Sequence, residues 1–181
     1  MEKNDLIIHL QDICFNYPGS PQVLDRLDLK FYRVNRIGLM WPNGSGKTTL
    51  FHIIMGLLRP SSGSIEIFNR PVETEKDFIR VRERIGLLFQ DADDQLFSPT
   101  VLEDVAFGPL NMGKSRDEAM DIARNTLNFL GLTGFEDRIT YKLSVGEKKL
   151  VSLATFLAIK PEVLLFDEPT SGLDERTKAT L

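Results

Sequence analysis

The stretch from Arg36 to Leu50, RIGLMWPNGSGKTTL, constrains the fold more than any other part of the sequence. A short apolar run leads into GSGKTT, and an apolar helical pattern follows. This is nearly the phosphate-binding loop G-x-x-x-x-G-K-[ST], in the strand–loop–helix context that the loop requires. Glycines let consecutive backbone N–H groups converge on phosphate, and the helix N-terminus adds its dipole and free N–H groups. The alternative is a glycine-rich turn that only starts a helix.

The loop predicts roles for its side chains. Lys47 is expected to reach the terminal phosphates of a nucleotide, and Thr48 is expected to hold Mg²⁺. The predicted nucleotide-binding residues of the loop and first helical turn are Asn43, Gly44, Ser45, Gly46, Lys47, Thr48 and Thr49.

One position departs from the loop pattern. Trp41 stands where the first glycine is expected, and Gly38 is out of register. That glycine makes the sharp exit from the strand, so an indole there should distort the loop. Overpacking typically costs ~1–3 kcal/mol, and ~3 kcal/mol is on the order of 100-fold in affinity. We therefore expect severely weakened nucleotide binding, unless the indole turns to solvent or stacks on a base.

A second motif ends an apolar run near the end of the sequence. Val163–Phe166 reads as a buried strand, and Asp167 and Glu168 follow it directly. The register favours Asp167 for a water-mediated Mg²⁺ contact and Glu168 for the attacking water. An apolar run that ends in two carboxylates is a weak signal alone, because it also fits a helix cap. Its combination with GSGKTT makes the catalytic interpretation much more specific.

Composition limits the possible classes of protein. The 181 residues are 42% hydrophobic and 27% charged, which favours one soluble globular domain over a disordered or collagen-like chain. The net charge of −4 argues against DNA or RNA as a partner. Cys14 is the single cysteine, which excludes an internal disulfide. No run approaches the ~20 apolar residues of a membrane span, and the start MEKND does not resemble a signal peptide.

Hydrophobic periodicity predicts an α/β fold with an antiparallel N-terminal β portion and a largely parallel core. The segment from 90 to 134 is expected to be mostly helical, and a helical subdomain is expected at roughly 91–160. The predicted strands are Leu6–Phe15, Leu27–Val34, Arg36–Met40, Ile65–Phe68, Ile85–Phe89 and Val163–Phe166, and the predicted helices are Lys47–Leu58, Arg116–Leu130 and Ser144–Lys160.

Between the two motifs lies LSVGE, residues 143–147, at the start of a predicted helix. With it, the whole chain resembles the ATP-binding subunit of an ABC transporter, whose signature reads LSGGE or LSGGQ. The resemblance implies a P-loop fold, the substrate ATP with Mg²⁺, and ATP hydrolysis that drives transport. It implies that Ser144, Gly146 and Glu147 contact the nucleotide of a second ABC subunit.

The same resemblance assigns further residues. Tyr17 in FNYPG matches the aromatic residue that stacks on adenine, and Gln90 in LLFQ matches the glutamine that touches Mg²⁺ and the transmembrane partner. Asp167 and Glu168 match the acidic pair, and Asp174 belongs to the D-loop sequence SGLD. Residues 91–113 resemble the energy-coupling and cobalt/nickel importer branch. A solvated acidic loop before a surface helix is the alternative for that stretch.

A second departure lies in the signature, where Val145 replaces the first glycine. A β-branched side chain there should hold the phosphate away and restrict the backbone. The family pairs subunits head to tail, so each site joins one phosphate loop to the partner's signature. A homodimer would combine Trp41 with Val145 in both sites, whereas an intact paralogue would separate the two departures.

The family also places a switch histidine on the strand after the acidic pair, and this sequence has none there. His9 and His52 lie elsewhere and are expected to be structural or exposed. We therefore expect a fragment that is poorly stable alone, forming one ABC-type domain over residues 1–181.

Three functions fit these residues. The first is the ATP-binding subunit of a cobalt, nickel or vitamin importer, on the cytoplasmic face of the membrane with a permease subunit and a second ABC subunit. We expect this chain to hydrolyse ATP very weakly or not at all. The second is a non-catalytic regulatory or structural subunit. The third is an ABC ATPase of DNA repair or translation, which the importer-like segment disfavours.

Overall fold

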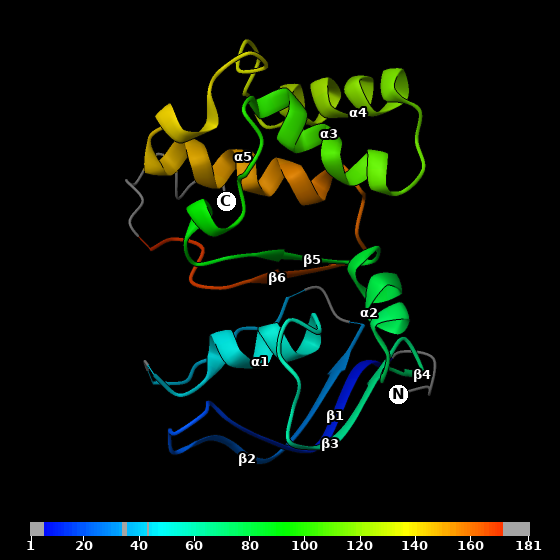
Figure 1. Cartoon of the computed structure of the whole chain (residues 1–181), viewed down its shortest axis with the longest axis vertical. Coiled ribbons are helices and arrows are strands. Elements are labelled where there is room, and N and C mark those ends of the chain that lie inside the picture. Colours follow the sequence, from blue (N-terminus) through cyan, green and yellow to red (C-terminus); the bar gives the residue numbers. More distant parts are fainter. Residues whose placement is uncertain (1–5, 34–35, 43, 172–181) are drawn as a thin grey trace. The chain divides into compact units, whose positions relative to one another are not determined.

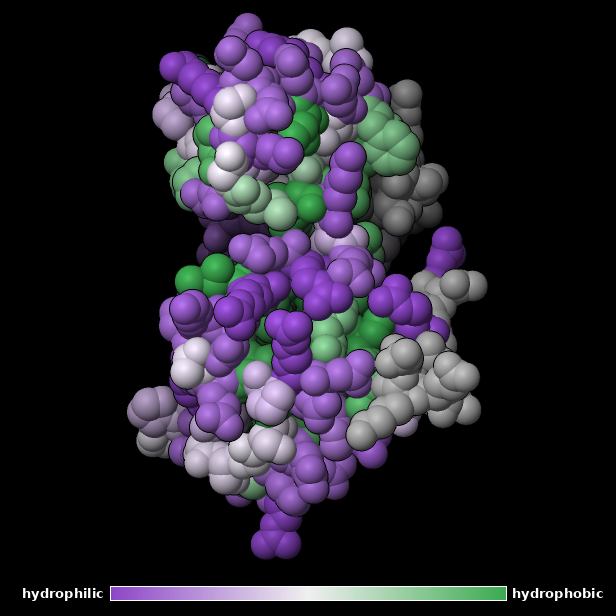
Figure 2. Space-filling view, turned by 90° about the vertical axis from the view of Figure 1, so that its right-hand side faces the viewer, coloured by the Kyte–Doolittle hydropathy of each residue, from purple (hydrophilic) through white to green (hydrophobic). Residues whose placement is uncertain are grey.

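The computed structural model describes residues 6–33, 36–42 and 44–171. The chain divides into two compact units, residues 1–82 and 83–181 (Figure 1). Hydrophilic side chains cover most of the face of each unit that Figure 2 presents. Within the described ranges, no helix has the length and apolar character needed to cross a membrane.

The first unit is built on an antiparallel sheet of four strands in the order β2-β1-β3-β4. The strands are β1 (Leu6–Asn16), β2 (Gln22–Tyr32), β3 (Ser62–Ile67) and β4 (Arg70–Pro71). The long β1–β2 hairpin buries Ile8, Leu10 and Ile13, which are the apolar residues of its inner face. This confirms the expected antiparallel N-terminal portion.

Helix α1 (Lys47–Ile54) follows the phosphate loop and lies over the sheet of its unit (Figure 1). It is shorter than predicted because Gly56 adopts a left-handed φ of +71°. A Cβ atom on Gly56 would lie 2.3 Å from the Phe78 ring, so the close approach of α2 requires glycine here. The chain therefore leaves the helix one turn before the predicted end at Leu58.

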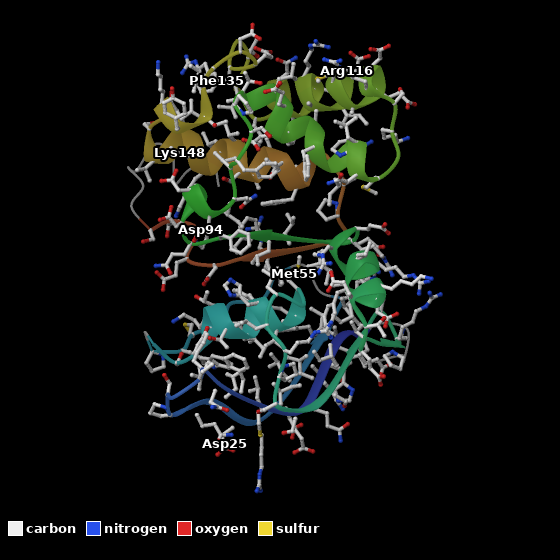
Figure 3. The ribbon with its side chains drawn as sticks, in the orientation of Figure 1. Asp25, Met55, Asp94, Arg116, Phe135 and Lys148 are labelled. Atoms are coloured by element: carbon white, nitrogen blue, oxygen red, sulfur yellow. The ribbon has the colours of Figure 1, made fainter. Side chains whose placement is uncertain are left out.

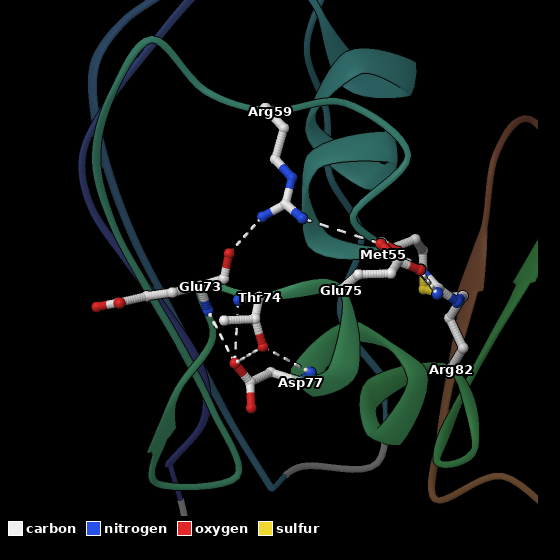
Figure 4. A network of polar contacts seen from close by, with 7 residues as sticks. All are labelled: Met55, Arg59, Glu73, Thr74, Glu75, Asp77 and Arg82. Atoms are coloured by element: carbon white, nitrogen blue, oxygen red, sulfur yellow. Dashed lines mark hydrogen bonds and ion pairs between the residues drawn. The ribbon is translucent and has the colours of Figure 1, made fainter.

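Helix α2 (Glu75–Arg82) completes the first unit and was not predicted. Asp77 accepts hydrogen bonds from the backbone N–H and the hydroxyl of Thr74, at 3.0 and 2.6 Å. The Arg82 guanidinium donates to the Met55 carbonyl at 3.0 Å, and Arg59 donates to the Glu73 carbonyl. Figure 4 shows this network, which holds α2 against the end of α1.

The second unit contains two parallel strands and a group of helices. Strands β5 (Ile85–Leu88) and β6 (Val163–Phe166) pair in register over their full length. The helices are α3 (Val101–Asn111), α4 (Arg116–Phe129) and α5 (Val145–Leu157), with short 3₁₀ turns η2 (Ala92–Asp94) and η3 (Thr140–Lys142). The predicted α4, α5, β5 and β6 are confirmed to within a few residues, and α3 falls in the segment expected to be helical.

Close packing joins α5 to strand β5, and α3 to the chain that follows α5. A Cβ atom on Gly86 of β5 would lie 2.8 Å from the Phe156 ring of α5. A Cβ atom on Gly108 of α3 would lie 2.7 Å from Ile159 Cγ2. Both glycines therefore allow a close approach of backbone to side chain. The helical core is formed by Val101, Val105, Ala119, Ala123, Leu127, Val151 and Ala154, among others.

The predicted strand Arg36–Met40 is absent. These residues have no regular secondary structure, and Ile37 and Met40 are 52% and 95% exposed. A strand must pair its backbone N–H and C=O groups, and within the described residues no strand pairs with this stretch. The parallel part of the fold is therefore the β5–β6 pair alone in the described ranges, which is smaller than the expected largely parallel core.

Candidate nucleotide-binding site

The phosphate loop keeps the glycine conformations that its sequence requires. Gly44 and Gly46 have left-handed φ angles of +78° and +92°. A Cβ atom on Gly46 would lie 2.8 Å from Val23 Cγ1, so a larger residue would collide with the β1–β2 hairpin. The chain can turn into α1 this tightly because both positions are glycine.

The start of α1 offers hydrogen-bond donors to a ligand. Gly46 caps the helix without a side-chain hydrogen bond, and the first turn contains no acidic residue. The buried hydroxyl of Ser45 has no hydrogen-bond partner among the described residues. Free N–H groups at a helix N-terminus and an orphaned hydroxyl are the features that bind phosphate. The loop as it stands therefore fits the phosphates of a nucleotide.

Lys47 bridges the loop. Its ammonium donates to the carbonyl oxygens of Trp41 and Pro42, at 2.8 and 3.2 Å. Trp41 is half-buried, and the group that accepts from Lys47 is its backbone carbonyl. The Lys47 ammonium has three donors, so these two bonds leave one donor for a phosphate oxygen. The two carbonyl contacts could not be read from the loop motif.

Tyr17 lies at the end of the β1–β2 hairpin and touches α1. Its hydroxyl is 3.1 Å from the Thr49 hydroxyl. Its ring packs edge-on against Phe15, with ring centres 5.0 Å apart. Tyr17 is 40% exposed, so an aromatic surface remains open beside the helix that follows the loop.

The second unit brings Gln90 and Glu168 together. Parallel strands end at the same edge of a sheet, so the residues after β5 and β6 become neighbours. The Gln90 amide donates to the Glu168 carboxylate at 3.2 Å. Asp167 is only 3% exposed, and its backbone N–H donates to the Leu88 carbonyl at 3.0 Å. The contact between Gln90 and Glu168 unites two residues that sequence reasoning placed in one reaction.

The LSVGE segment forms the start of α5. Ser144 caps the helix: its hydroxyl accepts the Glu147 N–H at 3.3 Å, and the Glu147 carboxylate accepts the Ser144 N–H at 2.8 Å. The Ser144 N–H that donates to the carboxylate holds the pKa of Glu147 below its ordinary value, and Arg138 lowers it further. Val145 is the first helical residue and is 58% exposed. Its side chain therefore stands at the helix end where the family signature has glycine.

Two predicted residues, Asn43 and Asp174, lie outside the described residues. Within the described ranges, no three His, Cys, Asp or Glu side chains gather into a metal cluster. The loop residues and Tyr17 belong to the first unit, whereas Gln90, Asp167, Glu168 and the signature belong to the second.

Comparison with known proteins decides the family. The ABC transporter family model matches residues 24–171. The chain belongs to the ABC transporter family.

Its relatives extend the match. This ABC chain is 44% identical over 172 residues to the energy-coupling factor transporter ATP-binding protein EcfA of Methanothermobacter thermautotrophicus, covering 94% of this chain and 55% of that protein. It is similar to the structure of CbiO1 from Clostridium perfringens, described as part of the ABC transporter complex CbiONQ. That match has 38% identity and a TM-score of 0.81, and covers 97% of this chain and 70% of that one.

A dimeric ATP-binding cassette, solved in a post-hydrolysis state with ADP and phosphate, has 26% identity and a TM-score of 0.85. The match covers 96% of this chain and 79% of that one. This ABC chain spans 64% of the length of a similar curated protein from Nitratidesulfovibrio vulgaris and 53% of one from Methanosarcina mazei. These findings confirm the predicted family and its energy-coupling and cobalt/nickel branch, as well as the ABC-type α/β fold.

The ABC signature helix makes contacts that the sequence did not reveal. Lys148 pairs with Asp93 of η2, and Figure 3 shows Lys148 on α5 with the neighbouring Asp94 on η2. The Gln95 amide donates to the Ser152 carbonyl and to the Thr155 hydroxyl, both at 2.8 Å. The segment after Gln90 is thus tied to α5.

Lys149 is the functional candidate that sequence reasoning missed. It is 2% exposed, although lysine is almost never buried without partners. Its ammonium donates to the carbonyls of Glu168, Pro169 and Ser171. In the sequence it stands between Lys148 and an apolar residue, and nothing there distinguishes it from an exposed lysine.

Proposed function

We propose that this chain is the nucleotide-binding part of the ATP-binding subunit of an ABC importer, which couples Mg-ATP binding and hydrolysis to transport. The observation that carries the proposal is the phosphate loop, with two left-handed glycines, an uncapped helix start and the orphaned Ser45 hydroxyl. The likeness to the energy-coupling factor proteins and to CbiO1 supports an importer of this branch, and we propose cobalt, nickel or a vitamin as its transported substrate. We assign the chain to the cytoplasmic face of the membrane.

In the proposed chemistry, Glu168 acts on the attacking water and Asp167 on the metal ion. Glu168 orients the attacking water and accepts its proton, and Gln90 holds the Glu168 carboxylate from one side. Mg²⁺, when bound, would neutralise charge on the phosphates, and Thr48, Gln90 and Asp167 are the side chains that would hold it. Tyr17 offers its exposed ring to the adenine base.

The proposed partners are a transmembrane permease subunit and a second ABC subunit. The description of CbiO1 as part of a complex supports the first, and the dimeric cassette supports the second. In such a dimer, Ser144, Gly146 and Glu147 would face the nucleotide of the other subunit, together with Asp174 of the D-loop. Nucleic acid is not among the proposed partners.

We further propose that Trp41 and Val145 impair this chain. Trp41 places an indole where the loop motif has its first glycine, and the carbonyl of the same residue accepts from Lys47, so the bulk of the side chain lies at the loop itself. Val145 exposes a β-branched side chain at the start of α5. The first effect would weaken ATP binding, and the second would keep the γ-phosphate from the signature N–H groups.

Calorimetry with Mg-ATP tests the proposal. The chain is compared with its Trp41→Gly, Val145→Gly variant, and Lys47→Met in that variant is the control that removes the phosphate contact. Tight binding by the double variant alone supports both the nucleotide site and its impairment. Equal binding by the two proteins contradicts the effect of Trp41 on affinity. If neither binds, the proposed function of this chain is wrong.

A non-catalytic regulatory or structural subunit is the second candidate. The observation that favours it is the coincidence of Trp41 and Val145, one at each half of the composite site. ATP turnover in the presence of the membrane partner separates the candidates. Turnover that depends on Glu168 supports the catalytic subunit, whereas assembly with the permease without turnover supports the regulatory one.

A further inference from the structure

The most unusual charged group in the second unit is the buried ammonium of Lys149. It lies in α5, yet it reaches the segment that follows β6, where Glu168 is 19 residues further along the chain. Nζ donates to the carbonyl oxygens of Glu168 at 3.3 Å, Pro169 at 3.2 Å and Ser171 at 2.8 Å. An ammonium has three donors. All three donors therefore have an acceptor in one short stretch of backbone.

That stretch is a tight turn that the chain would not adopt without support. Glu168 has a left-handed φ of +45°, which is unfavourable for a residue with a side chain. The Ser171 N–H donates to the Glu168 carbonyl at 3.0 Å and closes the turn. The same carbonyl also accepts from Lys149. The lysine thus binds the first, second and last residues of the turn.

Charge around Lys149 is consistent with this arrangement. Burial lowers the pKa of the Lys149 ammonium below its ordinary value, while the carboxylates of Asp91 and Glu168 act in the opposite direction. A buried charge is tolerated when it is paired and hydrogen-bonded. Three carbonyl dipoles and two nearby carboxylates meet that requirement.

We propose that Lys149 is a positioning residue that fixes the turn 168–171 and thereby the place of the Glu168 carboxylate beside Gln90. The inference rests on the proposed function where it concerns turnover. Because Lys149 follows Ser144 and Val145 on α5, it joins the signature helix directly to the turn that carries the proposed catalytic glutamate. A movement of α5 would then shift the turn and the position of Glu168.

The first test uses the unsubstituted chain and an amine-acetylating reagent. Lys149 is expected to react on the order of tenfold more slowly than the exposed Lys142, because its ammonium is buried and fully hydrogen-bonded. Equal rates of acetylation would overturn the proposal without any variant having to fold.

The second test measures amide hydrogen exchange by NMR in Lys149→Met, which keeps the length of the side chain and removes its donors. The Ser171 amide is expected to exchange on the order of tenfold faster, while α3 and α4 are unchanged. Lys149→Arg restores donors and is expected to recover protection. Lys148→Met is the matched control, with the same loss of charge one residue away, and leaves Ser171 protected. Unchanged exchange in Lys149→Met would overturn the proposal.

The third test separates positioning from mere stability. In the Trp41→Gly, Val145→Gly background, Lys149→Met is expected to lower kcat about tenfold at an unchanged KM for ATP, and Lys149→Arg recovers kcat. Faster exchange with an unchanged kcat would overturn the link to catalysis. If the background itself has no turnover, the proposed ATPase function fails, and acetylation and exchange still decide the role of Lys149.

Discussion

At the scale of single residues, Asp104 of α3 shows how burial governs a carboxyl group. It is 2% exposed, and its Oδ1 accepts the backbone N–H groups of Phe97 and Ser98, at 3.3 and 3.0 Å. Its Oδ2 has no hydrogen-bond partner among the described residues. Burial raises the pKa of Asp104 above its ordinary value, and the two N–H groups oppose the shift.

Because the pKa of Asp104 is raised on folding, the free energy of unfolding depends on pH. The folded state holds the Asp104 proton more tightly than the unfolded state, so the contribution is favourable at low pH and is lost as pH rises through the raised pKa. We expect Asp104→Asn to remove that loss, because the amide oxygen still accepts both N–H groups. Urea unfolding from pH 4 to pH 7 measures the effect. Asp121→Asn, with the same change on an exposed residue, should not alter the slope, and an unchanged slope in Asp104→Asn contradicts the assignment.

At the scale of elements, three helices begin with the same capping box. Thr100 and Glu103 start α3, Ser115 and Glu118 start α4, and Ser144 and Glu147 start α5. The serine and glutamate of the ABC signature therefore already have a structural role in their own helix. Any role toward a partner's phosphate comes in addition to it.

The paired caps allow the two roles of Ser144 to be separated. Ser115→Ala and Ser144→Ala should each lower the free energy of unfolding by about 1 kcal/mol, because each leaves a helix N–H without its acceptor. Only Ser144→Ala should also reduce ATP turnover in the Trp41→Gly, Val145→Gly background. Thermal unfolding and a phosphate-release assay give the two readouts. Equal turnover in both alanine variants would show that Ser144 acts as a cap alone.

At the scale of the molecule, the sequence predicts what depends on local patterns. The β1–β2 hairpin, α4, α5 and β6 follow from periodicity and turns, and Gln90 and Glu168 meet because their strands are parallel neighbours. The strand at 36–40 could not be decided locally, since pairing depends on another segment. The burial of Lys149 could not be predicted for a related reason, because it depends on contacts with the turn that follows β6. The loop glycines could be recognised, but not the carbonyls that hold Lys47.

The composite site of the proposed head-to-tail dimer gives a last prediction for the whole molecule. Trp41→Gly alone repairs the phosphate loop, and Val145→Gly alone repairs the signature. Each single-variant homodimer still has one departure in both of its sites. A dimer of the two variants has one fully repaired site, made of the loop of one chain and the signature of the other.

Mixing the two single variants should therefore restore ATP turnover that neither has alone. If the chains exchange freely, the mixture should reach about a quarter of the turnover of the double variant, since half of the dimers carry one repaired site of two. Phosphate release by the mixture is compared with the mean of the separate proteins. Adding Lys47→Met to the Trp41→Gly chain should abolish the gain, because it disables the repaired site, whereas the same change in the Val145→Gly chain should not. A mixture that only equals the mean would mean that the sites are not shared between chains.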